Sequence, residues 1–322
     1  AFTFTTPNAG TSGISGGFTL TTGTASNGDS GGFALSTGDA TSGKSGSMLL
    51  KLGTGNTGHG GSFELDVGDT TGANGDGGSI TVTAGHSNDA SGNHGGSIAI
   101  TAGHTKGSET SDNGGSITVN AGLAATGNGG NIDISTGYSE STSSGAFTFT
   151  TPNAGTSGIS GGFKFSTGAS TGGDSGSFSL TTGDAVNGKA GSFVMKVGSG
   201  NTGVGGDISV AAGETTDAAS GGMFKVITGR GTKTSSGNLV VETANAGSAG
   251  VSGSVQVNTG TASAGTSGSL TLNTGHATGG KGGDMVLSVG TGTTGTGGDV
   301  AITAGKTTDS ASGGSMTLRT GY

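Results

Sequence analysis

The sequence predicts an all-β protein, a rod-shaped parallel β-solenoid (β-helix) of about 21 coils of 15–16 residues, of either hand. Three observations predict it. The hydrophobic fraction of the 322 residues is 28%, below the roughly 45–50% of an average globular chain, so a large conventional core is excluded. Glycine supplies 77 residues, many of them at fixed offsets from apolar pairs. Those pairs recur at a nearly constant interval, a register that disordered sequence has no reason to keep.

The repeating element is a pair of apolar residues separated by one polar residue. Glycine lies two residues before each pair wherever the sequence extends that far back, and a second glycine usually follows five residues after the first apolar position. We term the stretch that begins at each pair a repeat. The first apolar residues of the repeats are Phe2, Phe18, Phe33, Met48, Phe63, Ile80, Ile98, Ile117, Ile132, Phe147, Phe163, Phe178, Phe193, Ile208, Phe224, Leu239, Val255, Leu270, Met285, Val300 and Met316.

A single repeat shows why a strand is expected. Alternation with period 2 places Phe33, Leu35 and Thr37 on one side of an extended chain and Ala34 and Ser36 on the other. A coil built from such a strand has an interior only one side chain deep. Stacked coils would hydrogen-bond to the coils above and below and bury each apolar pair against theirs.

Glycine at fixed offsets is typical of backbone corners, which need either a positive φ or a close approach between two segments. Two or three such corners in 15 residues would close one coil. The expected structural corners include Gly16, Gly31, Gly38, Gly130, Gly206 and Gly298.

A longer period lies over the short one. The stretch 146–162 repeats 1–17 letter for letter, and 238–253 repeats it approximately. We therefore expect one continuous array over 1–322, with super-repeats 1–145 of nine coils, 146–237 of six coils and 238–322 of six coils, the last truncated. The repeats that open each super-repeat carry an extra apolar residue, expected either to fill a widened core or to contact another rod. The expected assembly markers are Pro7, Ile14, Pro152, Ile159 and Val251.

Composition and charge exclude several functions. The net charge is −8 with only 12 Lys and Arg along the chain, so no basic face for nucleic acid is expected. No apolar run approaches the roughly 20 residues that span a bilayer, so no membrane insertion is expected. No nucleophile with an ordered base and no paired carboxylates can be assembled, so we expect no enzyme, no catalytic residue and no cofactor.

Metal binding has two candidate sets, each with a plainer alternative. The stretch 279–287 fits a nine-residue calcium pattern, and Asp207, Asp284 and Asp299 share one offset in their repeats, although most repeats carry serine there and none is nine residues long. Polar corner residues are the alternative.

The second set contains histidine. His86 and His104 share an offset in adjacent repeats and would share a divalent metal if the coils stack, with Asp89, Glu109 or Asp112 nearby. Exposed loop histidines are the alternative.

Threonines dominate the outward positions of several repeats, including Thr3, Thr5, Thr19, Thr21, Thr81 and Thr83. Such Thr-x-Thr ladders resemble the ice-binding surface of β-solenoid antifreeze proteins. Charged residues at Lys51, Glu64 and Asp66 interrupt the ladder, and threonine also suits exposed strands in general.

The Gly/Ser/Thr-rich strings at 262–275 and 291–305 resemble the tandem repeat arrays of secreted and surface fibre proteins of heterokont algae and related protists, including shafts similar to flagellar hairs. The resemblance implies an extracellular or cell-surface location and a structural role.

The expected function is thus a structural segment of an extracellular fibre or surface shaft, assembling by coil stacking and lateral contacts. An ice-binding or glycan-binding adhesin that uses the outward threonines is the alternative. The expected partners are further copies in a filament, other fibre proteins and glycans. Any glycans are expected to be O-linked, because the sequence has no Asn-x-Ser/Thr sequon.

Overall fold

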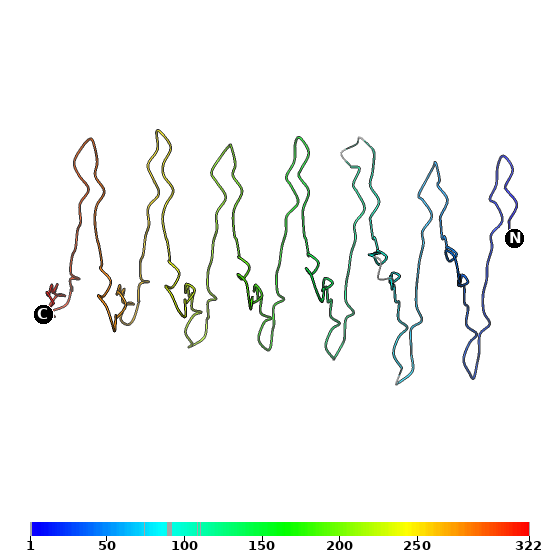
Figure 1. The fold of residues 1–322 in the computed structure, drawn as a ribbon, viewed down its shortest axis with the longest axis horizontal. Helices are drawn as coiled ribbons and strands as arrows, with labels where there is room; N and C mark the ends of the chain where they lie inside the picture. The colour runs from blue at the N-terminus through cyan, green and yellow to red at the C-terminus, as the bar shows by residue number, and fades with distance from the viewer. Residues whose placement is uncertain (1, 74, 89–91, 108, 110, 322) are drawn as a thin grey trace. The chain divides into compact units, whose positions relative to one another are not determined.

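The computed structural model describes residues 2–73, 75–88, 92–107, 109 and 111–321. None of these residues forms a helix or a β-strand, and Figure 1 accordingly draws the chain as a plain ribbon without coils or arrows. The predicted all-β, parallel β-solenoid fold is therefore wrong. The chain divides into two halves, Ala1–Lys164 and Phe165–Tyr322, and the division falls inside the apolar pair of one repeat.

The repeat is nevertheless present in the backbone of each half. Extended runs that carry the apolar pairs alternate with bends that reverse the chain (Figure 1). In the first half the bends include residues 11–13, 26–28, 41–43 and 56–58, and in the second half 171–173, 186–188, 201–204 and 216–219. Each bend lies between the glycine that follows one apolar pair and the glycine that precedes the next. The regular spacing of apolar pairs and glycines thus corresponds to a series of loops and not to the coils of a solenoid.

The two arms of each loop meet in an antiparallel register at a contact that we term the neck. A β-carbon placed on Gly16 would lie 3.2 Å from Cβ of Thr6, the residue four positions after Phe2. The same pairing, between the residue four after one apolar position and the glycine two before the next, recurs at every described reversal except the one that ends at Gly61. Consecutive apolar segments therefore approach each other antiparallel, whereas a solenoid stacks them parallel.

Backbone hydrogen bonds close some necks but build no ladder. The amide of Gly96 donates to the carbonyl of Gly85 at 2.8 Å, and the amide of Gly222 donates to Gly213 at 2.9 Å. A strand requires a succession of such bonds between neighbouring segments. The described necks show one at most, which is the physical reason that the expected sheet is missing.

The presence of this bond correlates with the neck residue. Where it is alanine, the backbone bond is present in each case, at Ala84, Ala102, Ala121, Ala212 and Ala304. Where it is threonine the bond is usually missing, and in two such necks the threonine hydroxyl donates to a glycine carbonyl instead: Thr37 to Gly46 at 3.3 Å and Thr243 to Gly253 at 3.2 Å. A bare methyl group lets the arms approach further than a branched side chain does.

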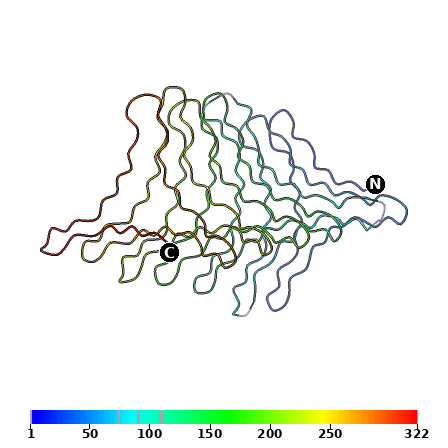
Figure 2. The ribbon, with the colours of Figure 1, turned by 60° about the vertical axis from the view of Figure 1, so that its left-hand side comes forward.

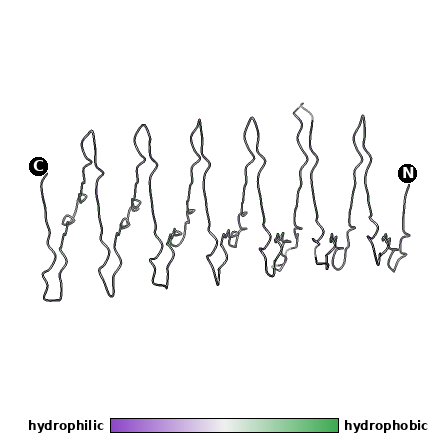
Figure 3. Cartoon of the chain, turned by 90° about the horizontal axis from the view of Figure 1, so that it is seen from below, coloured by the Kyte–Doolittle hydropathy of each residue, from purple (hydrophilic) through white to green (hydrophobic). Residues whose placement is uncertain are grey.

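No side chain is buried in the part of the chain that the structure describes. Even the least exposed large apolar residue, Val67, keeps 39% of its surface, and the total accessible area is 31973 Å². A folded monomer of this mass would expose about 12,000 Å² and an extended chain about 43,000 Å². Within each half, Figures 2 and 3 show extended runs joined by loops. Each half therefore leaves its apolar pairs accessible.

Five of the six expected corner glycines lie at necks, and one does not. Gly16, Gly31, Gly130, Gly206 and Gly298 lie at necks, where the opposite arm approaches the site of a β-carbon, whereas Gly38 has no such neighbour within 4 Å. None of these six is among the glycines with positive φ. Positive φ occurs instead at loop tips, as in Gly58 (73°) and Gly203 (74°).

Candidate assembly site

Aromatic rings meet across the first neck. The register that places Thr6 opposite Gly16 also places Phe4 opposite Phe18, two residues further along each arm. The ring centroids of Phe4 and Phe18 are 5.8 Å apart at 38°, and Phe2 contacts Phe4 edge-on at 4.7 Å and 86°. Such separations and tilts are those that aromatic quadrupoles favour. We term Phe2, Phe4 and Phe18 the first aromatic cluster.

The letter-for-letter repeat builds the same cluster again. Phe147 contacts Phe149 at 4.5 Å and 84°, and Phe149 contacts Phe163 at 5.6 Å and 41°. We term these three residues the second aromatic cluster. Both contacts agree closely with those of the first cluster, as the identical local sequence of the two stretches leads us to expect.

A hollow adjoins the first cluster. Its volume is about 410 Å³, and Phe4, Thr5, Thr6 and Phe18 line it. The two rings remain 72% and 67% exposed, so the hollow is accessible from solvent. The lining carries no charge and offers aromatic faces and threonine side chains, which suit an apolar occupant rather than an ion.

The marker residues lie in the loops of the same repeats. Ile14, Ile159 and Val251 are 99%, 98% and 97% exposed, so they fill no core within their own chain. The expected contact with another rod stays a prediction. Pro7 follows the neck residue Thr6 and places its Cδ 3.9 Å from a β-carbon on Gly16, so its fixed φ stiffens that arm of the neck. Pro152 holds the corresponding position after Thr151.

The candidate calcium aspartates each follow a neck glycine directly. Asp284 forms an ion pair with Lys281, whose Nζ lies 2.9 Å from Oδ1 of Asp284. Asp207 and Asp299 hold the same offset in other repeats. Among the described residues, no three His, Asp or Glu side chains gather where they could hold a metal ion.

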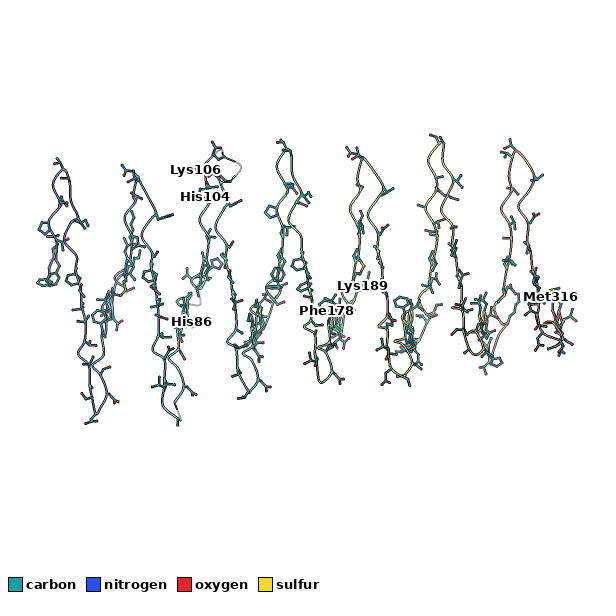
Figure 4. The ribbon with its side chains drawn as sticks, turned by 180° about the vertical axis from the view of Figure 1, so that it is seen from behind. His86, His104, Lys106, Phe178, Lys189 and Met316 are labelled. Atoms are coloured by element: carbon teal, nitrogen blue, oxygen red, sulfur yellow. The ribbon has the colours of Figure 1, made fainter. Side chains whose placement is uncertain are left out.

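The two candidate histidines are not brought together. Figure 4 shows His86 and His104 apart, with His104 in the same loop as Lys106. In that loop Asp112 accepts a hydrogen bond from the amide of Glu109 at 3.1 Å. Asp89 lies outside the described residues. Stacked coils would have aligned the two histidines, and the antiparallel necks do not.

The outward threonines do not form a flat ladder, because a ladder needs neighbouring strands and the described residues contain none. Thr5 and Thr6 instead take part in the hollow and the neck of the first repeat. The aromatic clusters were not anticipated as sites. Their signal is the run Phe-Thr-Phe followed by a third phenylalanine at the next repeat.

Comparisons with protein-family models, curated proteins and solved structures find no match to this chain. No described segment forms a helix of the length and apolarity needed to cross a membrane.

Proposed function

We propose that this chain is a structural segment of an extracellular fibre or surface shaft, and that it assembles laterally with further copies of itself. The observation that carries the proposal is the regular series of exposed apolar pairs over a chain that buries none of them.

The large accessible surface of the chain supports association with partners. The chain exposes 31973 Å², against about 12,000 Å² for a folded monomer of equal mass. Contiguous apolar surface beyond a few hundred Å² is typical of association sites. Burial of the phenylalanine, isoleucine and leucine pairs between chains would supply the stabilisation that no intrachain core provides.

A second copy is the natural partner because it has the same spacing. Two copies have the same series of spacings, mostly 15–16 residues, so their pairs match along the whole length when the chains are in register, whereas a partner of another period would match only locally. The resemblance to Gly/Ser/Thr-rich fibre arrays supports this role, an extracellular location and O-linked glycans on exposed Ser and Thr.

Sedimentation velocity over a concentration series, with electron microscopy of the same samples, tests the proposal. We expect the mean mass to rise with concentration and elongated assemblies to form. A chain that remains monomeric up to its solubility limit, in buffer near 0.15 M salt, would contradict the proposal.

A further inference from the structure

We infer that the marker repeats carry a specific contact between copies, in which the loop-tip isoleucine of one copy enters the hollow beside the aromatic cluster of another. The tips are Ile14 and Ile159. The acceptor is the hollow beside the first aromatic cluster, and the second aromatic cluster is its counterpart in sequence and in ring contacts. This inference rests on the proposed self-assembly and assigns residues to it.

The isoleucine at each loop tip is exposed to solvent and packs against no surface of its own chain. Ile14 follows the bend at 11–13, in which Gly13 has a φ of 130°, and Ile159 follows Gly158, with a φ of 152°. Both glycines adopt backbone that other residues avoid, so the loop shape is set at the residue before the tip. Exposures of 99% and 98% mean that neither isoleucine has a partner surface in its own chain.

The hollow matches such a tip in chemistry. Phe4, Thr5, Thr6 and Phe18 offer rings and methyl groups around about 410 Å³, at the small end of ligand pockets. All five residues of the contact, with Ile14, are uncharged. Two copies of net charge −8 can therefore meet there without juxtaposing like charges.

The sequence of the markers indicates that the occupant is a second copy. The tip Ile14 lies in the loop between Phe4 and Phe18, which both line the hollow, and the residues of this tip and this lining recur in sequence over 149–163. In the third marker the positions of the three rings hold Leu239, Val241 and Val255, and its tip is the smaller Val251. Tip and acceptor thus change together, as two sides of one contact would.

The contact is heterologous, because the tip and the hollow are different surfaces of the chain. Heterologous contacts that do not close into a ring generate filaments. Each copy offers an exposed tip more than once, so copies can join in a staggered series.

The first experiment removes the tips from the full chain. The triple variant Ile14→Ser, Ile159→Ser, Val251→Ser is compared by sedimentation velocity with the control Leu123→Ser, Val204→Ser. The control residues are 98% and 99% exposed loop residues of ordinary repeats. We expect the dissociation constant of the triple variant to rise at least roughly tenfold, the value of one buried aliphatic side chain, and that of the control to change less than about twofold.

A second experiment tests the pairing itself. The tip-less triple variant is mixed with a hollow-less variant, Phe4→Ala and Phe149→Ala, which keeps its tips. We expect each alone to associate weakly and the mixture to form complexes, because the tips of one chain reach intact hollows on the other.

The outcomes are distinct. A wild-type chain that never associates overturns both the proposed function and this contact. A wild-type chain that associates, with the tip-less variant equal to the control or with no complex in the mixture, overturns the contact alone.

Discussion

Cγ1 of Val197 lies 2.8 Å from the place that a β-carbon on Gly206 would occupy, closer than real β-carbons approach their neighbours. The same relationship, at the same distance, joins Val289 and Gly298. At these two necks the glycine before the apolar pair therefore permits an approach that a side chain would block.

Gly206→Val is expected to open its neck. The added side chain collides with Val197, and displacement of that arm should cost roughly 1–3 kcal/mol of the free energy that holds the neck closed. The measurement is the nuclear Overhauser contact between the Val197 methyl groups and residue 206. Gly205→Val is the matched control, because no atom lies within 4 Å of its β-carbon position. Retention of the contact in Gly206→Val would refute this explanation of the repeat.

Ala84→Thr is expected to weaken the bond between the Gly96 amide and the Gly85 carbonyl, which is 2.8 Å long. The branched side chain holds the arms further apart, as in most threonine necks. A typical hydrogen bond contributes about 0.5–1.5 kcal/mol, so the Gly96 amide should exchange with solvent roughly 2- to 13-fold faster. Ala99→Thr, in the same half but away from a neck, should leave that rate unchanged. Equal rates in both variants would show that the neck residue does not control the bond.

Lys281→Met is expected to have little effect on the second half. Lys281 and Asp284 are 80% and 69% exposed, and exposed ion pairs contribute under about 1 kcal/mol. The chemical shifts of Asp284 should change on substitution, while those of Met285 and the following residues should not. Broad changes through the repeat would show that the pair organises more than its own loop.

Assembly is expected to strengthen as salt rises from low concentration to about 0.15 M. Copies of net charge −8 repel one another, and added ions screen that repulsion to about 8 Å. The apolar contacts themselves are not weakened by this change. The measurement is the dissociation constant at several salt concentrations, and a steady weakening with salt would indicate that ion pairs rather than apolar pairs hold the copies.

The repeat and its glycines could be predicted from sequence, but the relation between repeats could not. Alternation such as Phe33, Leu35, Thr37 is the same in a parallel coil, an antiparallel pair and a lone extended run, because it reports only which side chains share a side. The direction of pairing depends on the loop, and the neck register that opposes Phe4 to Phe18 becomes visible only in the structure. Ile14 was identified as a marker from its excess apolarity. Its exposure, which decides between core and contact, depends on where the loop places it.

The central claim is that apolar side chains are exposed in the isolated chain and covered only when copies assemble. Hydroxyl-radical footprinting of Phe4 and Phe18, at a dilution where the chain is monomeric and at a concentration where it assembles, tests this most directly. We predict that both rings react at the rate of a free peptide when dilute and several-fold more slowly in the assembly. Rings already protected at the monomeric dilution would show an intrachain core and contradict the claim.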